Sequence, residues 1–165
     1  MTPLRHTALF LLLVLAGCSG YHFGEGDSSV LDPEYRTIAI EDVNNPTTLS
    51  WLEPEVRKLL RDELNRRGTI TWTDDRARAD ALITIDITRY NRPTAVAGRR
   101  EETLRSEAIF EFEAHIRSSR SGEVLWRSGR MSQTWPFFTG DEAEADAEVT
   151  RLGIRRLADR MTQNY

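Results

Sequence analysis

A near-regular alternation of apolar and polar residues over Thr103–Arg117 (TLRSEAIFEFEAHIR) constrains the fold of this chain more than any other feature. Side chains of a β-strand point alternately to opposite faces, so this period of two predicts a long strand with one buried face. The even positions carry the apolar side chains, namely Leu104, Ala108, Phe110, Phe112, Ala114 and Ile116. The odd positions mostly carry polar ones, with Glu107, Glu111, Glu113 and His115. Such a strand needs partner strands at its edges and a second layer over its apolar face.

The neighbouring segments predict the remaining strands of a sheet. A turn at 118–122 (SSRSG) leads into a return strand over 123–135, which completes a hairpin. Further strands are expected over 35–41, 70–73 and 81–90, the last of which alternates isoleucine with polar residues. The segment 91–98 contains a proline and a glycine and is predicted to be a loop.

Two amphipathic helices are expected to cover the sheet. The first has Ser50 and Glu53 in a capping-box pattern, Pro54 in its first turn, and Gly68 as its stop. Its apolar residues Leu52, Val56, Leu59, Leu60 and Leu64 follow helical spacing. The second helix is predicted over 141–161, with acidic residues near its amino-terminal, positive dipole end.

The order β, α, β, β, β, β, α predicts one α+β domain over 34–165. Both helices would pack on one face of a four- to five-stranded mixed sheet, as a two-layer sandwich. The other face of the sheet would be more polar and available to a partner or to water.

The amino terminus has the features of a lipoprotein signal peptide over residues 1–17. Arg5 supplies a positive charge, a nine-residue apolar run follows, and the small residues before Cys18 complete a lipobox pattern. The pattern predicts cleavage before Cys18, an S-diacylglycerol on its thiol and an acyl chain such as palmitate on its amino group. Those chains would anchor the protein stably to a membrane, with residues 18–33 as a lipidated tether. In the sorting of bacterial lipoproteins an aspartate directly after the cysteine often retains the protein in the inner membrane. Ser19 at this position therefore favours the outer membrane.

The sequence offers no constellation for catalysis or metal binding. One cysteine excludes an internal disulfide framework and a cysteine-type zinc site, and the three histidines form no known ligand pattern. No nucleophile and base can be paired, so we expect no enzyme, no metal and no cofactor other than the covalent lipid. The formal net charge of −4 argues against a nucleic-acid partner.

Several segments together resemble the lipopolysaccharide-assembly lipoprotein family (LptE-like). They are GYHF at 20–23, YRTIAI at 35–40, the NNPT loop at 44–47, LEPEVRKLLRDELNRRG at 52–68, ADALI at 79–83 and SGEVLW at 121–126. The resemblance implies a lipoprotein at the periplasmic face of the outer membrane of a Gram-negative bacterium, without catalytic activity. It would help assemble and would plug a lipopolysaccharide-translocating β-barrel (LptD-like), and would contact lipopolysaccharide on its way to the outer leaflet. Two alternatives remain: a regulatory lipoprotein that binds a cell-wall synthase, and an oligomeric secretion-channel lipoprotein.

The charge distribution suggests where an anionic lipid would bind. Residues 18–88 carry 8 basic and 14 acidic residues, whereas residues 89–130 carry 9 basic and 6 acidic residues. Guanidinium groups of this positive block suit phosphorylated sugars, and the candidates are Arg89, Arg92, Arg99, Arg100, Arg117 and Arg120. Solvated arginines paired with nearby glutamates are the alternative. Trp135, Phe137 and Phe138 are candidates either for partner contact or for the core.

Overall fold

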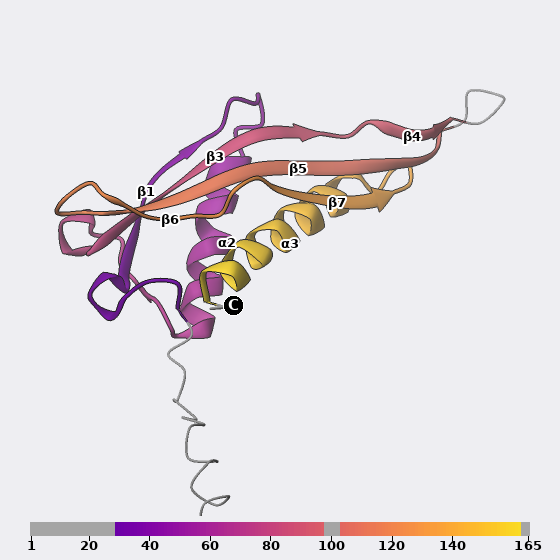
Figure 1. Cartoon of the computed structure of the whole chain (residues 1–165). Coiled ribbons are helices and arrows are strands. Elements are labelled where there is room, and N and C mark those ends of the chain that lie inside the picture. The colour runs from indigo at the N-terminus through magenta and orange to yellow at the C-terminus, as the bar shows by residue number, and fades with distance from the viewer. Residues whose placement is uncertain (1–28, 98–102, 163–165) are drawn as a thin grey trace, which may run out of the picture.

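The structure is a computed structural model that describes residues 29–97 and 103–162 of the 165-residue chain. The elements in these ranges are, in chain order, η1 (Pro33–Tyr35), β1 (Thr37–Asn44), α2 (Leu52–Arg67), β2 (Thr71–Trp72), η2 (Arg76–Arg78), β3 (Ala81–Asn91), β4 (Thr94–Ala97), β5 (Thr103–Ser118), β6 (Val124–Arg127), β7 (Met131–Phe137) and α3 (Glu142–Thr162). Figure 1 shows their arrangement.

The strands of the described residues form one mixed sheet with β5 near its middle. β1 pairs in parallel with β2 and β3, whereas β3, β4, β6 and β7 all pair with β5 in antiparallel fashion. Residues 109–112 of β5 pair with both β3 and β7, so these two strands lie on opposite sides of β5. By the same registers β4 pairs with β5 on the same side as β3, and β6 and β7 both pair with β5 on its other side. The seven strands therefore occupy five positions across the sheet, each of which is called a row here. This arrangement confirms the predicted mixed sheet.

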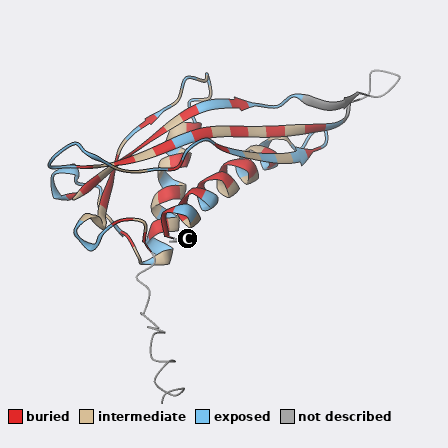
Figure 2. Cartoon of the chain, viewed as in Figure 1, coloured by how far each residue is buried: buried red, intermediate tan, exposed pale blue. Residues whose placement is uncertain are grey.

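Both helices lie on the same face of the sheet and enclose the core (Figure 1). α2 contacts β1 and β2, α3 contacts β5 and β7, and the two helices contact each other. Buried residues alternate with less buried ones along β5 (Figure 2). The even-numbered residues Ala108, Phe110, Phe112, Ala114 and Ile116 are all buried, as the period of two predicts. The two-layer α+β sandwich is thus confirmed.

α3 approaches the sheet closely at Gly153. A Cβ atom at this position would lie 2.8 Å from Cδ1 of Phe110 and 3.3 Å from Cε1 of Phe112. The two phenylalanine rings stack with their centroids 4.5 Å apart, and both side chains are fully buried. Only glycine lets the helix backbone rest directly on this pair.

Two strand predictions need correction. The segment 91–98 contains β4, which pairs with the start of β5 although its own sequence shows no strand pattern. The return strand predicted over 123–135 is split into β6 and β7 by residues 128–130. There Ser128 bonds Ala114 through both backbone and side chain, and Gly129 adopts a φ of 62°. This kink at residues 128–130 interrupts the pairing locally, and β7 then continues alongside β5 where β6 ended.

The position of β7 on the outer side of β5 explains why a proline is tolerated in this strand. Pro136 is opposite Glu107, whose backbone N–H donates to the carbonyl of Pro93 in the row on the other side of β5. Backbone polar groups of Pro136 must then point away from β5, toward the free edge. The missing N–H costs no sheet hydrogen bond there and removes a donor that a foreign strand could use.

The first helix ends as predicted but begins differently. Gly68 takes the left-handed conformation with φ of 70°, and its N–H donates to the carbonyl of Leu64. At the other end Trp51 is the N-cap, and no side chain caps the helix. The capping box predicted from Ser50 and Glu53 is therefore wrong, and Glu53 instead pairs with Arg57 one turn along the helix.

Candidate functional site

The face of the sheet opposite the helices is polar, as expected from the sequence. Its central feature is the pair of Arg117 on β5 and Glu41 on β1. Nε of Arg117 donates to Oε2 of Glu41 at 2.8 Å, and Nη2 donates to the other carboxylate oxygen. Thr84 on β3 adds a hydrogen bond of 3.3 Å. The hydrogen bonds from Arg117 lower the pKa of Glu41, because they stabilise the ionised carboxylate.

Two glutamates of β5 on this face, Glu111 and Glu113, lie near arginines. Glu111 pairs with Arg89 at 3.1 Å, and Glu113 lies 3.9 Å from Arg130. These are cross-strand ion pairs on an exposed surface rather than an isolated pair of catalytic carboxylates. Among residues 29–97 and 103–162, no group of histidine, cysteine and acidic side chains could hold a metal ion.

The structure separates the arginine candidates into two places. Arg89 and Arg92 lie toward the β4 end of the sheet, whereas Arg117 and Arg120 lie at the β6 end. Arg89 is opposite Glu111, six residues along β5 from Arg117, which is about 20 Å at roughly 3.4 Å per residue.

The four described candidates also have carboxylate partners. Arg92 lies 3.5 Å from Asp146 and Arg120 lies 3.7 Å from Asp80, while Arg89 and Arg117 pair with the glutamates named above. Arg120 is 86% exposed, so its pair is weak. Cys18, Arg99 and Arg100 lie outside the described residues.

Asp146, the partner of Arg92, belongs to a largely buried polar network. The hydroxyl of Tyr90 lies 3.2 Å from Oγ1 of Thr150 and 3.3 Å from Oδ1 of Asp146. Burial raises the pKa of Tyr90, so its phenol stays neutral at physiological pH. Burial also raises the pKa of Asp146, and the charge of Arg92 opposes that effect. The network joins β3 to α3 at the end of the sheet that carries β4.

The three aromatic candidates have different environments. Phe137 is 7% exposed and belongs to the core, and Trp135 packs partly against that core. Phe138, just beyond β7, is 65% exposed and is the largest apolar side chain with that degree of exposure in the described part of the chain. Phe138 is therefore the member of the set that is free to contact a partner.

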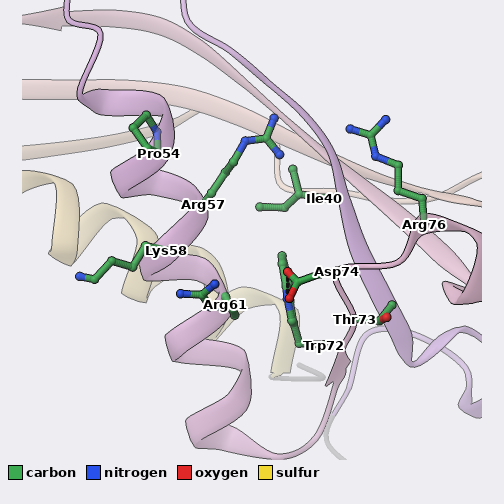
Figure 3. A pocket seen from close by; sticks show the side chains of 9 residues that line it. All are labelled: Ile40, Pro54, Arg57, Lys58, Arg61, Trp72, Thr73, Asp74 and Arg76. Atoms are coloured by element: carbon green, nitrogen blue, oxygen red, sulfur yellow. Dashed lines mark hydrogen bonds between the residues drawn. The ribbon is translucent and has the colours of Figure 1, made fainter.

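Sequence reasoning missed a cleft between α2 and the β1–β2 edge (Figure 3). Its volume is about 450 Å³, and its lining residues are Ile40, Pro54, Arg57, Lys58, Arg61, Trp72, Thr73, Asp74 and Arg76. The spacing of Arg57, Lys58 and Arg61 on one helix could have signalled its basic side. Its other side could not be found, because Trp72 and Arg76 reach it only through the parallel pairing of β2 with β1.

No helix among the described residues is long and apolar enough to cross a membrane.

Comparison with known proteins identifies a family. The sequence model of the lipopolysaccharide-assembly family LptE matches residues 35–164. A search of curated proteins gives no match.

Solved structures share the fold at low sequence identity. A PelC dodecamer subunit from Paraburkholderia phytofirmans is 13% identical with a TM-score of 0.57, over 82% of this chain and 95% of that one. The rare lipoprotein B from Shewanella oneidensis is 14% identical with a TM-score of 0.51, over 76% and 89%. A lipoprotein B from Nitrosomonas europaea is 10% identical with a TM-score of 0.52, over 80% and 88%.

Proposed function

Since this chain belongs to the lipopolysaccharide-assembly family LptE, we propose that it helps assemble a lipopolysaccharide-translocating outer-membrane β-barrel and occupies its lumen. It would also contact lipopolysaccharide as the lipid passes to the outer leaflet. The match over residues 35–164, which spans the described domain, is the observation that carries the proposal. Members of this family act in lipopolysaccharide assembly without catalysing a reaction.

The surface of the domain suits a plug. The lumen of a large outer-membrane barrel is polar, so a protein inside it needs a polar exterior with few apolar patches. The open face of the sheet carries ion pairs such as Glu41–Arg117 and Arg89–Glu111, and the core is confined to the side covered by the helices. These features support a protein that packs in a polar space rather than one that inserts into lipid.

In the proposed function, the lipid expected on Cys18 anchors the protein to the membrane. The family and the lipoprotein neighbours point to a lipoprotein of the cell envelope. We place it at the periplasmic face of the outer membrane, held by the S-diacylglycerol and N-acyl groups expected on Cys18. Three acyl chains exceed the two signals that stable attachment requires.

The test is purification of the full lipidated chain from envelopes after mild crosslinking, followed by identification of bound proteins. Recovery of a large β-barrel, together with co-purified lipopolysaccharide, is the expected result. Recovery of a peptidoglycan synthase in place of the barrel would refute the proposal in favour of a regulatory lipoprotein. A self-assembled ring without a barrel would refute it in favour of a secretion-channel subunit.

A point substitution makes the same experiment sharper. Phe138→Ser removes the most exposed large apolar side chain of residues 29–97 and 103–162 without touching the core. Reduced barrel recovery from a folded Phe138→Ser chain would assign the β7–α3 corner to the interface. Phe137→Ser is not a suitable variant, because that side chain is buried and its loss would unfold the region.

A further inference from the structure

The cleft between α2 and the β1–β2 edge concentrates positive charge in the most acidic part of the sequence. Residues 18–88 carry 14 acidic and 8 basic residues. Four of these eight basic residues, Arg57, Lys58, Arg61 and Arg76, line the cleft, against one acidic residue, Asp74. The local balance of +3 is therefore created by the fold and is opposite in sign to that of the segment.

The cationic groups approach the cleft from two sides. Figure 3 shows the side chain of Arg57 extending from α2 and that of Arg76 extending from η2, with their guanidinium groups on either side of Ile40. Arg61 and Lys58 continue the basic side along the helix. An anion in the cleft would thus meet positive charge from both walls.

Acidic side chains compensate the cations of α2 in part, and Lys58 lies 3.5 Å from Glu55. Arg57 is the best paired, with Glu53 at 3.0 Å and Asp42 at 3.5 Å. Arg61 has only a 3.6 Å contact to its sequence neighbour Asp62, with both side chains more than 40% exposed. Arg76 donates to the backbone carbonyl of Glu41, and its charge also helps to lower the pKa of the Glu41 carboxyl. A guanidinium has five N–H donors, so Arg57 and Arg76, which lie on either side of Ile40, each keep donors for an anion between them.

The lining of the cleft also includes apolar and aromatic side chains. They are Ile40, Pro54 and the half-buried Trp72. Nε1 of Trp72 donates to Oδ1 of Asp74 at 2.9 Å, which holds the indole in place and leaves a second carboxylate oxygen as an acceptor. An indole face accepts the C–H face of a sugar ring, a carboxylate accepts sugar hydroxyls, and guanidinium groups bind phosphate. A volume of about 450 Å³ lies within the range of small-ligand sites.

We propose that this cleft binds a phosphorylated sugar, with its ring on Trp72 and its phosphate between Arg57 and Arg76. The site is separate from the arginines of residues 89–130 that the sequence suggested. The assignment of the ligand to the phosphorylated saccharide of lipopolysaccharide, rather than to a free sugar phosphate, rests on the proposed function.

The test uses the full chain in detergent and follows binding by calorimetry and by the NMR signal of the Trp72 indole N–H. Glucose 6-phosphate is the probe, with glucose and inorganic phosphate as comparisons. Glucose 6-phosphate should bind most tightly and should shift the Trp72 signal. Equal binding of glucose would refute the role of the arginines, and equal binding of inorganic phosphate would refute the sugar contact.

Matched variants locate the site. Arg57→Gln with Arg76→Gln should weaken glucose 6-phosphate binding by about tenfold or more, since two charge-assisted contacts are lost. The control is Arg66→Gln with Arg78→Gln, which removes the same charge from the same two elements, α2 and η2, outside the cleft. An equal loss in the control would show a general charge effect and would overturn the proposal.

The source of the ligand is decided by competition. Purified lipopolysaccharide should displace glucose 6-phosphate, and lipopolysaccharide stripped of its phosphates should not. Failure of both to compete would overturn the assignment to lipopolysaccharide. Because these measurements need no barrel, a cleft that fails to bind while the barrel is still recovered rejects only the cleft, and the reverse result rejects only the proposed function.

Discussion

Replacing Gly153 by alanine tests how tightly α3 rests on the sheet. In an unconstrained helix this change would stabilise the protein by about 1 kcal/mol, because glycine is a poor helix former. Here the new methyl group would lie 2.8 Å from Phe110, which is too close for carbon atoms. The Phe110 ring cannot easily retreat, since it is fully buried and lies between Tyr90 and Phe112, with centroid distances of 5.6 Å and 4.5 Å.

The expected balance is a net loss of stability. Overpacking of a core costs about 1–3 kcal/mol, which equals or exceeds the helix-propensity gain and leaves a loss of up to about 2 kcal/mol. For a chain of this length each kcal/mol changes the Tm by about 2–4 °C, so the Tm should fall by up to about 8 °C. Thermal unfolding followed by circular dichroism measures this change, with urea denaturation as an independent measure of the free energy of unfolding.

A double-mutant cycle separates the steric clash from other effects. Phe110→Leu shortens the side chain that the methyl group meets, so Gly153→Ala should cost less in that background than in the wild type. An unchanged cost would mean that the Phe110 ring is not the obstacle. A rise in Tm for Gly153→Ala alone would refute the close approach of α3 to β5.

Three further outcomes follow from the described contacts and the predicted anchor. Tyr90→Phe removes the hydrogen bonds of the phenol with Asp146 and Thr150 and should lower the free energy of unfolding by about 1–2 kcal/mol in urea titrations, with the helix content unchanged. Arg117→Gln removes the cause of the lowered pKa of Glu41. The wild type should therefore exceed this variant in stability at pH 7, and the difference should shrink as the pH falls below the ordinary value of 4.5, where Glu41 is protonated first in the unfolded chain. A larger difference at pH 3 than at pH 7 would contradict that sign. Cys18→Ser should leave the chain unprocessed and unlipidated, measured as a higher mass and the absence of labelled palmitate.

The local elements could be predicted because their signals are local. The alternation in β5 and the glycine after α2 depend on side-chain direction and on one backbone angle, both of which act within a few residues. β4 and the break between β6 and β7 escaped prediction for the opposite reason. Pairing with β5 supplies the hydrogen bonds of β4, and the kink at Ser128 depends on its contact with Ala114, 14 residues away.

The candidate site shows the same division. The sequence by itself determined the family resemblance, the two-layer α+β class, the lipid-anchor prediction and the polar character of one sheet face. Only the tertiary structure decided how the charges are grouped. The extended geometry of β5 separates Arg89 from Arg117, although they belong to one basic block, whereas the parallel pairing of β1 and β2 brings Arg76 to Arg57 across an otherwise acidic segment. Electrostatic interaction depends on distance in space, so net charge counted along the chain could not locate the basic cleft.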